Sequence, residues 1–539
     1  MKNKIFIGTL LIGLLSIVSC KKDFLDLAPN ENITEEQAFS TMIQTENFVN
    51  NIYSVLPTAQ ARINSTPYDS MSDEGFATYT ASAITFSGGG YGPSNITTYI
   101  NVWRNSYVGI RKANIALLKL PDVPVLNPED EETRKRLRGE VLFMRAFLYF
   151  DILKIYGRFP IIDKPRSVND DVVLTRNSYE ECVAFILKDL NDAIPLLPTT
   201  YAATNLLGRA NGAMCMALKS RLLLYAASPL NSADVAAKWQ AAAVASKEVI
   251  DLNQFTLYNA LANKADNYKA IFNVFANNEI IWFRNQGNNK NYEQYYYPPG
   301  LSGWGNTTPT QNFVDEYQMA NGLDITNPAS GYDPTRPYIG REPRFYATVW
   351  YNGSISRGVN IQTYPGGNSA INGGTNNTKT GYYLRKFVDE NVSLSTGSGR
   401  QAMSIWFRLA EMYINYAEAS NEANTSPSAD PLIYTYVNVI RTRAGLPNLA
   451  TGLNKEQMRL AIRHERRVEL SFEEHRFFDD RRWKLRFGGD IKAINWNAAG
   501  TSYTISVAQN RPFEEKMWYM PIPQSEVDVT KVAQNPGWQ

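Results

Sequence analysis

The chain has 539 residues, with 54 lysines and arginines against 52 aspartates and glutamates. Lys2 and Lys4 account for the small positive excess, so the remainder of the chain is electrically balanced. This balance argues against a nucleic-acid partner, which would require a basic surface, and against electrostatic steering of an anionic substrate. A neutral ligand fits better, and the length allows a large core or several modules packed as one body.

The first twenty residues have the pattern of a secretory signal that ends in a cysteine. Two lysines precede the uncharged apolar run 5–18, and Cys20 follows directly after a small residue. This run is shorter than the ~20 residues that a membrane-spanning helix needs, and the order of segments is typical of a cleaved signal peptide. We predict a signal peptide over residues 1–19 and lipidation of Cys20, which would tether the mature chain to a membrane. The alternative is an ordinary signal peptide with an incidental cysteine.

Residues 20–254 are predicted to form a series of helices of similar length. Apolar side chains recur at helical spacing, as in Ile100, Trp103, Tyr107, Ile110 and Leu117. Helix starts are indicated by Thr34 with Gln37, by Asn127 before Pro128, and by Ser178 with Glu181. Successive helices with short joins are typical of an α-solenoid of helix pairs. We therefore predict a mainly α fold with a tetratricopeptide-like helical-pair scaffold.

Residues 255–401 have a different composition, in which Gly, Asn, Pro, Thr and Tyr dominate and helical periodicity mostly disappears. The pattern predicts long loops with short strands, for example over 346–351 and 382–388. Long loops in a compact protein are functional or disordered, and the many aromatic residues argue against disorder. Helices are predicted to resume at Ser404, with Trp406 on a buried stripe, and to complete the scaffold over 402–539.

The sequence lacks the motifs of several common catalytic and metal-site classes. It has no G-x-S-x-G elbow, no phosphate-binding loop and no paired cysteines at zinc spacing. His464 and His475 are expected on one helix as structural residues. Cys182 and Cys215 are predicted to be buried, with a disulfide between them as the alternative. We expect no catalytic residue, metal or cofactor, although a two-carboxylate glycosidase stays open because its carboxylates are paired only in three dimensions.

A dense run of charged and aromatic residues occupies 462–483. Glu465, Glu469 and Glu473 are spaced by four, which places them on one face of the predicted helix. The arginines close by are Arg463, Arg467 and Arg476. Because apolar side chains are interspersed with these charges, we predict a partly buried ion-pair network rather than a binding site.

The same segment resembles the C-terminal signature of the SusD/RagB family of outer-membrane nutrient-binding lipoproteins. Other stretches agree with the family and follow its order along the chain. They include Phe24-Leu25-Asp26 after Cys20, Arg145-Ala146 with Tyr149-Phe150, Gly303-Trp304-Gly305, Trp406-Phe407-Arg408 with Glu411, Met520-Pro521-Ile522-Pro523 and Asn535-Pro536-Gly537.

The resemblance implies a tetratricopeptide-like scaffold with a large irregular loop-rich ligand-binding module on one side. It implies a lipid-anchored location on the outer membrane, facing the outside of the cell. The implied partners are an oligosaccharide or polysaccharide ligand and a SusC-like TonB-dependent transporter. Members similar to this chain are binding proteins and not enzymes. RagB-like members bind peptides, so a peptide ligand is the alternative.

Two tracts offer the aromatic rings and polar side chains that a neutral glycan requires. Sugar rings stack their C–H faces on aromatic side chains, while their hydroxyls need polar partners. The candidate ligand-binding residues are Asp73, Tyr79, Phe86 and Tyr91 in the first tract, and Tyr292, Tyr295, Tyr296 and Trp304 in the second. In the resembling family the pocket is built from these two regions. Trp304 lies inside a family signature, so a structural role for it is equally open.

Overall fold

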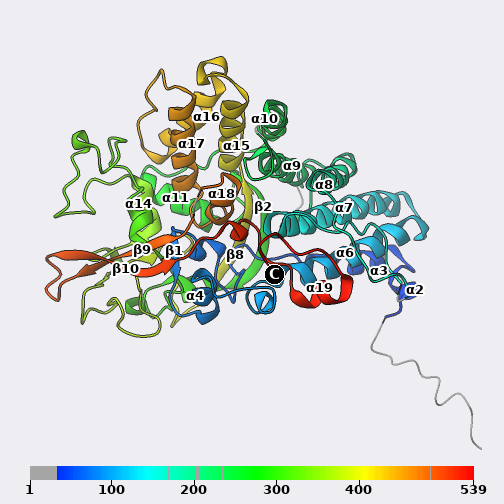
Figure 1. Ribbon diagram of the computed structural model, residues 1–539, viewed down its shortest axis with the longest axis horizontal. Helices are drawn as coiled ribbons and strands as arrows, with labels where there is room; N and C mark the ends of the chain where they lie inside the picture. Colours follow the sequence, from blue (N-terminus) through cyan, green and yellow to red (C-terminus); the bar gives the residue numbers. More distant parts are fainter. Residues whose placement is uncertain (1–32, 168, 202–205, 234, 486, 539) are drawn as a thin grey trace, which may run out of the picture.

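The computed structural model describes residues 33–167, 169–201, 206–233, 235–485 and 487–538. Helices stack side by side through one part of the molecule, and irregular loops with short strands fill the other (Figure 1). Cys20 and the predicted signal peptide lie outside the described residues. Within the described ranges, no helix combines the length and the apolar character that crossing a membrane requires.

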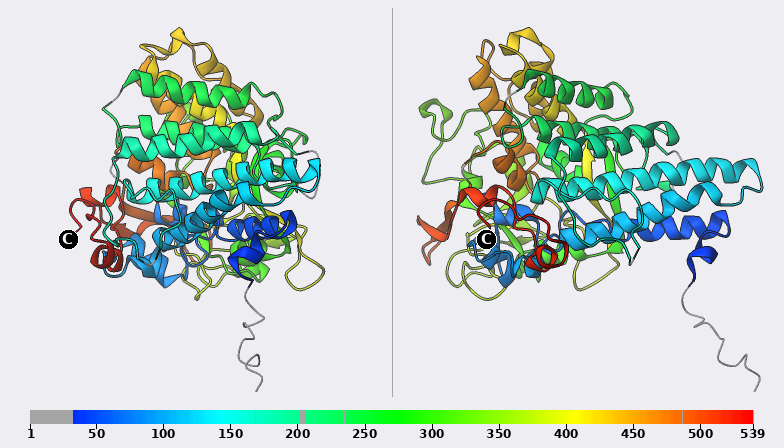
Figure 2. Two further views of the ribbon diagram at one scale, coloured as in Figure 1. Left: turned by 90° about the vertical axis from the view of Figure 1, so that its right-hand side faces the viewer. Right: turned by 45° about the vertical axis from the view of Figure 1, so that its right-hand side comes forward.

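The helical part is an array in which successive helices pack against one another (Figure 2). Its N-terminal members are α3 (Met42–Tyr53), α6 (Val102–Lys119), α7 (Pro128–Tyr156), α8 (Tyr179–Ala193), α9 (Gly212–Ala227) and α10 (Ala236–Ile250). The C-terminal helices α15 (Leu409–Ala423), α16 (Leu432–Ala444) and α17 (Lys455–Glu469) continue the array, because α15 packs on α10. The predicted mainly α, tetratricopeptide-like scaffold is confirmed.

The helix starts that local sequence indicates are present. Ser178 caps α8 through a reciprocal capping box, in which its hydroxyl accepts from the Glu181 N–H and the Glu181 carboxylate accepts from the Ser178 N–H. The same box joins Thr34 and Gln37 before the short helix α2 (Glu35–Ala38). Asn127 caps α7. These contacts span only three residues, which is why they can be predicted from sequence.

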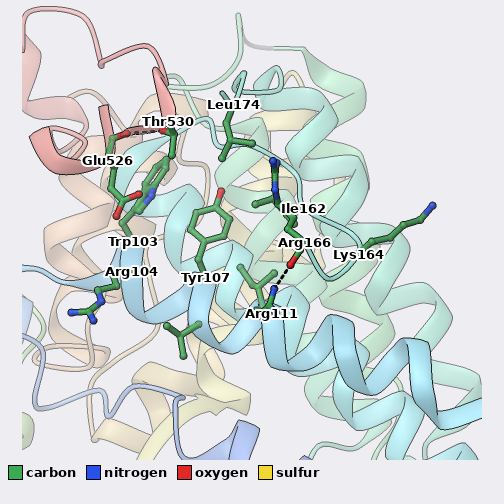
Figure 3. Close-up of a pocket in the computed structure, with 12 residues that line it drawn as sticks. Trp103, Arg104, Tyr107, Arg111, Ile162, Lys164, Arg166, Leu174, Glu526 and Thr530 are labelled. Atoms are coloured by element: carbon green, nitrogen blue, oxygen red, sulfur yellow. Dashed lines mark hydrogen bonds between the residues drawn. The ribbon is translucent and has the colours of Figure 1, made fainter. Parts of the chain in front are cut away.

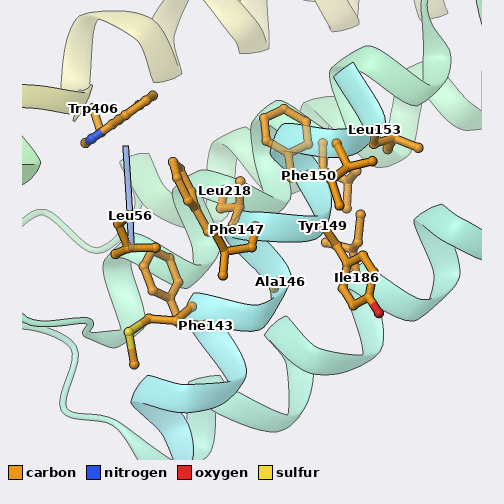
Figure 4. Close-up of a cluster of buried hydrophobic side chains, with 14 of the residues drawn as sticks. Leu56, Phe143, Ala146, Phe147, Tyr149, Phe150, Leu153, Ile186, Leu218 and Trp406 are labelled. Atoms are coloured by element: carbon orange, nitrogen blue, oxygen red, sulfur yellow. The ribbon is translucent and has the colours of Figure 1, made fainter. Parts of the chain in front are cut away.

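The main core lies inside the array around α7 (Figure 4). Phe147 on α7 meets Trp282 and Trp406 edge-on, with ring centroids 4.9 and 5.0 Å apart, and the two tryptophans are stacked on each other. The tryptophans come from strands and not from helices. Aromatic contacts therefore join the strand-bearing part of the molecule to the helical array.

The described strands pair two by two and antiparallel. The pairs are β1 (Gly75–Ala77) with β3 (Thr307–Pro309), β2 (Ile280–Asn289) with β8 (Arg400–Arg408), β4 (Val349–Trp350) with β7 (Tyr383–Leu384), β5 (Ile355–Ser356) with β6 (Val359–Asn360), and β9 (Gly489–Trp496) with β10 (Tyr503–Arg511). The strands predicted over 346–351 and 382–388 appear as the two-residue strands β4 and β7. The short helix α14 (Pro343–Thr348) occupies the start of the first of these ranges.

The prediction that helices resume at Ser404 is wrong. Strand β8 continues to Arg408, and α15 begins only at Leu409. Trp406 is buried as predicted, but on this strand. The C-terminal half of β8 is buried on both faces, so its apolar run does not alternate and cannot be told from a buried helix by periodicity.

The loop-rich part also contains short helices. They are α11 (Lys264–Asn273), α12 (Asn291–Tyr296) and α13 (Gln311–Val314). The tract between α3 and α6 adds α4 (Ala81–Ser87) and α5 (Ile96–Tyr99), and α19 (Gln524–Thr530) lies near the C-terminus.

The charged run is not one helix, so the placement of both histidines on a single helix is wrong. Helix α17 ends at Glu469 and α18 (Arg476–Arg482) begins after a turn. Phe472 and Glu474 in this turn have φ angles of 59° and 68°, a left-handed conformation that non-glycine residues seldom adopt. Tertiary contacts hold the turn, since the Glu474 N–H donates to Asp69 (2.8 Å) and the Phe472 N–H to Glu74 (3.4 Å).

The predicted ion-pair network is present and is almost fully buried. Glu469 accepts from Arg408 at 2.7 Å, from Arg344 at 3.0 Å and from Arg443. These arginines come from β8, α14 and α16, not from the charged run itself. Burial alone would raise the pKa of Glu469, but the three guanidinium groups outweigh it and hold that pKa well below its usual value.

Replacing Glu469 with Gln is expected to destabilise the fold strongly, by about 3–5 kcal/mol, because three buried arginines lose their shared counter-charge. Since the pKa is lowered, the ion pairs stabilise the fold above the ordinary glutamate pKa of about 4.3, and this contribution is lost as pH falls. Urea unfolding at neutral and acidic pH measures both effects. The control is Glu132→Gln, whose exposed partner is Lys135. An unchanged unfolding midpoint for Glu469→Gln would contradict the prediction.

Candidate functional site

Strand pairing brings the two predicted binding tracts together. In the β1–β3 pair, Ala77 faces Thr307, and beyond it the Thr78 N–H donates to the Asn306 carbonyl at 2.8 Å. Because the strands are antiparallel, the chain leaving β1 and the chain entering β3 lie at the same end of the pair. Tyr79 and Trp304 are therefore neighbours although 225 positions separate them in the sequence.

Three aromatic side chains meet at this point, and we call Tyr79, Tyr295 and Trp304 the aromatic platform. The ring centroids of Tyr79 and Trp304 are 6.4 Å apart and those of Tyr295 and Trp304 are 5.6 Å apart, both edge-to-face. Trp304 is 40% exposed and the two tyrosines are half-buried. Partial burial raises the pKa of Tyr79 to about 12, with the nearby Tyr295 adding to it, so this hydroxyl is neutral at physiological pH.

A tight turn fixes the indole of Trp304 on the platform. The Trp304 N–H donates to the Gln294 carbonyl at 2.8 Å, and the Asn306 N–H donates to the Tyr295 carbonyl at 2.7 Å. Gly303 permits the turn, because a Cβ atom there would lie 2.2 Å from the Tyr297 carbonyl oxygen. The family signature around Trp304 thus has a structural role in the turn while the indole itself stays exposed.

Polar groups surround the platform. The side chain of Asn306 donates to the Ser65 carbonyl at 2.8 Å and accepts from the Thr80 hydroxyl at 3.2 Å. Gln294 is half-buried next to Tyr295. Asn306 and Thr80 are buried and hold the platform in place, so the half-buried amide of Gln294 is the polar neighbour that a sugar ring on the aromatic faces could use.

The remaining candidate residues lie elsewhere. Tyr292 and Tyr296 are buried in the core of the loop-rich part, where the Tyr292 hydroxyl lies 3.0 Å from the Gln60 side-chain oxygen and 3.0 Å from the Met403 carbonyl oxygen. Phe86 is buried against Tyr91, with ring centroids 4.4 Å apart, and Tyr91 also contacts Trp538 near the C-terminus. None of these four rings contacts the platform rings directly, and the ligand-binding role of all the candidate residues stays a prediction.

Asp73 forms salt bridges with two arginines of the charged run. Its carboxylate accepts from Arg476 at 2.9 Å and from Arg467 at 2.9 Å. Burial works against ionisation, but the two arginines outweigh it and lower the pKa of Asp73. The sequence separates Asp73 from these partners by 394 and 403 residues and contains no signal for their pairing.

Glu474 and Asp69 hold the segment that precedes β1 to the turn between α17 and α18. Glu474 accepts from the Tyr68 N–H at 2.9 Å, while its own N–H donates to Asp69. Burial raises the pKa of Glu474 to about 7, although Arg62 and Lys154 act in the opposite direction. The position of the first binding tract therefore depends on the C-terminal charged segment.

The described residues contain no metal-binding cluster and no disulfide. No group of His, Cys, Asp and Glu side chains among the described residues is arranged to hold a metal ion. Cys182 and Cys215 are both buried and free, so the alternative of a disulfide between them is wrong. Burial raises the pKa of both thiols, which disfavours the reactive thiolate.

Comparison with known families gives the assignment. A family model described as "SusD family" matches residues 270–538, and one described as "Starch-binding associating with outer membrane" matches residues 23–224. The chain belongs to the SusD family. Proteins of the SusD family are binding proteins without catalytic activity, and the second description connects them with the outer membrane.

Relatives and solved structures agree with this assignment. SusD-like protein P38 of Formosa agariphila is 24% identical over 72% of both chains, and a SusD-like protein of Bacteroides ovatus is 22% identical over 90% of this chain and 83% of its own. The crystal structure of a SusD-like protein from Bacteroides fragilis superposes with a TM-score of 0.79 at 27% identity, covering 95% of this chain and all of that one. A laminarin-binding SusD-like protein has a TM-score of 0.66 at 23% identity, over 93% of this chain and all of its own.

Two adjacent tyrosines of α12 should respond differently to truncation. Tyr296 is fully buried, so Tyr296→Ala is expected to lower the free energy of unfolding by about 3–5 kcal/mol, as for other large aromatic residues in cores. Tyr295 is half-buried on the platform, and Tyr295→Ala should cost about 1 kcal/mol or less. Urea unfolding of both variants measures the difference, and equal losses would show that the platform is part of the core.

Proposed function

We propose that this SusD-family protein is a cell-surface glycan-binding lipoprotein that captures an oligosaccharide and delivers it to a SusC-like TonB-dependent transporter. The observation that carries the proposal is the aromatic platform. Three rings from two distant tracts meet edge-to-face, one of them 40% exposed, with the half-buried amide of Gln294 next to Tyr295. Such a surface matches the alternating apolar faces and hydroxyls of a sugar.

Charge and the comparisons support a neutral glycan as the ligand class. The chain has nearly equal numbers of basic and acidic residues. Among the structurally similar proteins, one is named a SusD-like carbohydrate binding protein, one is named laminarin-binding, and one is a surface glycan-binding protein of Bacteroides fluxus. These names describe those proteins, and they make neutral glucans the first ligands to test on this one.

A peptide is the alternative ligand on the same scaffold, and surface glycosidase activity is a weaker third possibility. A peptide requires partners for its backbone N–H and C=O groups, whereas a sugar requires ring-stacking faces. A binding screen against polysaccharides, including laminarin and starch, and against peptides separates the first two. Release of shorter sugars during prolonged incubation would favour the glycosidase.

Each of the variants Tyr79→Ala, Tyr295→Ala and Trp304→Ala removes one ring of the platform. An aromatic contact is worth about 0.5–1.5 kcal/mol beyond its buried area, so we expect affinity for the glycan found in the screen to fall about threefold to more than tenfold. Calorimetric titration measures the loss, and melting curves confirm that each variant is folded.

The matched control is Tyr436→Ala, which removes a half-buried tyrosine from α16 in the helical array. Its affinity for the glycan should equal that of the wild type. Wild-type affinity in all three platform variants would refute the platform as the site, and the remainder of the first tract, from Phe86 to Tyr91, would be the next to test.

The proposed lipid anchor depends on Cys20 alone. Cys20→Ala should leave the fold and glycan affinity intact, since residue 20 precedes the first described helix. It should release the protein from the membrane fraction, because a chain without acyl groups has no stable anchor. Fractionation in a strain that lacks the transporter measures this. Continued sedimentation of the variant with outer membranes would contradict lipidation at Cys20.

A further inference from the structure

A groove of about 330 Å³ lies between α6, α19 and the loop that follows α7, and no role has been assigned to it (Figure 3). Its floor is apolar and includes Trp103, Tyr107, Ile110, Ile162 and Leu174. The volume falls at the lower end of the range for small-molecule sites. The aromatic platform shares no residue with this groove.

The neutral polar groups of the groove already have partners within the protein. The Tyr107 hydroxyl donates to the Pro160 carbonyl at 2.7 Å, and the Thr530 hydroxyl donates to the Glu526 carbonyl at 2.6 Å. A sugar would find few free donors or acceptors here. A peptide backbone would lose hydrogen bonds to water without replacement, which costs free energy for each buried N–H or C=O group.

Cations outnumber carboxylates at the rim of the groove. The lining contains four cations, Arg104, Arg111, Lys164 and Arg166, and one carboxylate, Glu526. No carboxylate within the described ranges lies at salt-bridge distance from any of the four cations. Figure 3 shows Arg104 and Lys164 extending from opposite ends of the groove, with Arg111 between them donating to the Arg166 carbonyl at 2.7 Å.

The adjoining loop carries three acidic residues, Asp163, Asp170 and Asp171, and within the described ranges none of them forms a salt bridge with these cations. Asp170 accepts from the Ser167 N–H at 2.8 Å, and Asp171 accepts from the Val173 N–H at 2.9 Å. Both carboxylates thus stabilise the turn in which they lie. Buried arginines elsewhere either pair with carboxylates, as in the Glu469 network, or donate to backbone carbonyls, as Arg511 does. What distinguishes the groove is a lining with four cations and a single carboxylate.

Exposed aliphatic side chains extend the apolar surface beyond the groove. Val108 lines it and is 46% exposed, Val172 and Val173 precede the lining residue Leu174 and are 57% and 52% exposed, and Val529 precedes Thr530 and is 60% exposed. Clustered exposed aliphatic residues mark surfaces that bind apolar partners.

We propose that this groove binds a single-chain anionic amphiphile, with its acyl chain on the apolar floor and its anionic head group at the cationic rim. An acyl chain needs no hydrogen bonds, which fits a floor whose polar groups are already paired. The head group supplies the negative charge that the four rim cations lack. This inference is independent of glycan binding and of the lipid at Cys20.

The first test measures how the affinity of the wild-type protein for an amphiphile depends on the charge of the head group. Dodecanoate, dodecanol and dodecyltrimethylammonium have comparable chains but negative, neutral and positive heads, and each is titrated calorimetrically below its micelle concentration. One exposed ion pair contributes up to about a fivefold gain, so dodecanoate should bind about fivefold more tightly than dodecanol, with the cation weakest. Hexanoate should bind more weakly than dodecanoate, because less apolar surface is buried. Equal affinity for the three heads, or no binding of dodecanoate, overturns the proposal.

The second test uses the double variant Arg104→Gln/Lys164→Gln. Both side chains are exposed, so the melting temperature should stay unchanged, and dodecanoate affinity should fall about fivefold or more. The matched control, Arg336→Gln, removes an exposed arginine from the loop-rich part and should bind dodecanoate normally. Glycan affinity should be unchanged in both, which separates this site from the platform. Wild-type dodecanoate affinity in the double variant, or displacement of dodecanoate by an acidic peptide at lower concentration, overturns the proposal.

Discussion

The buried charge of Glu469 is the constraint on which the rest of the structure depends. This residue ends α17 and binds arginines that come from α14, β8 and α16. A carboxylate and guanidinium groups removed from water are tolerated only when all of them are paired, so these segments must assemble together. The loop-rich part has little regular backbone hydrogen bonding of its own, and the network joins it to the helical array.

The aromatic platform is a consequence of that assembly. The turn after Glu469 holds the Tyr68–Glu74 segment through Glu474 and Asp69, and this segment leads directly into β1. Pairing of β1 with β3 then places Tyr79 beside Trp304. The structural charge network and the proposed binding surface are thus consecutive parts of one series of contacts, through which the charged run sets the position of the platform.

The platform and the groove beside α6 differ in the groups that they leave free to contact a ligand. The platform offers exposed ring faces with neutral polar neighbours, which suits a polyol. The groove offers an apolar floor, polar groups that are already paired, and unpaired cations at its rim. The two proposed ligands should therefore not compete, because neither surface satisfies the requirements of the other ligand.

The sequence alone determined the features that depend on near neighbours in the chain. Capping boxes such as Ser178 with Glu181, helical periodicity, the family motifs and the charged run all lie within a few residues, and they predicted the scaffold and the two binding tracts. Tertiary structure decided the rest. Tyr295 and Tyr296 are adjacent and chemically identical, yet packing buries only the second. Strand β8 was mistaken for helix because burial on both faces removes alternation. The partners of Glu469 and Asp73 could not be predicted, because Coulombic pairing depends on distance in space and not on separation along the chain.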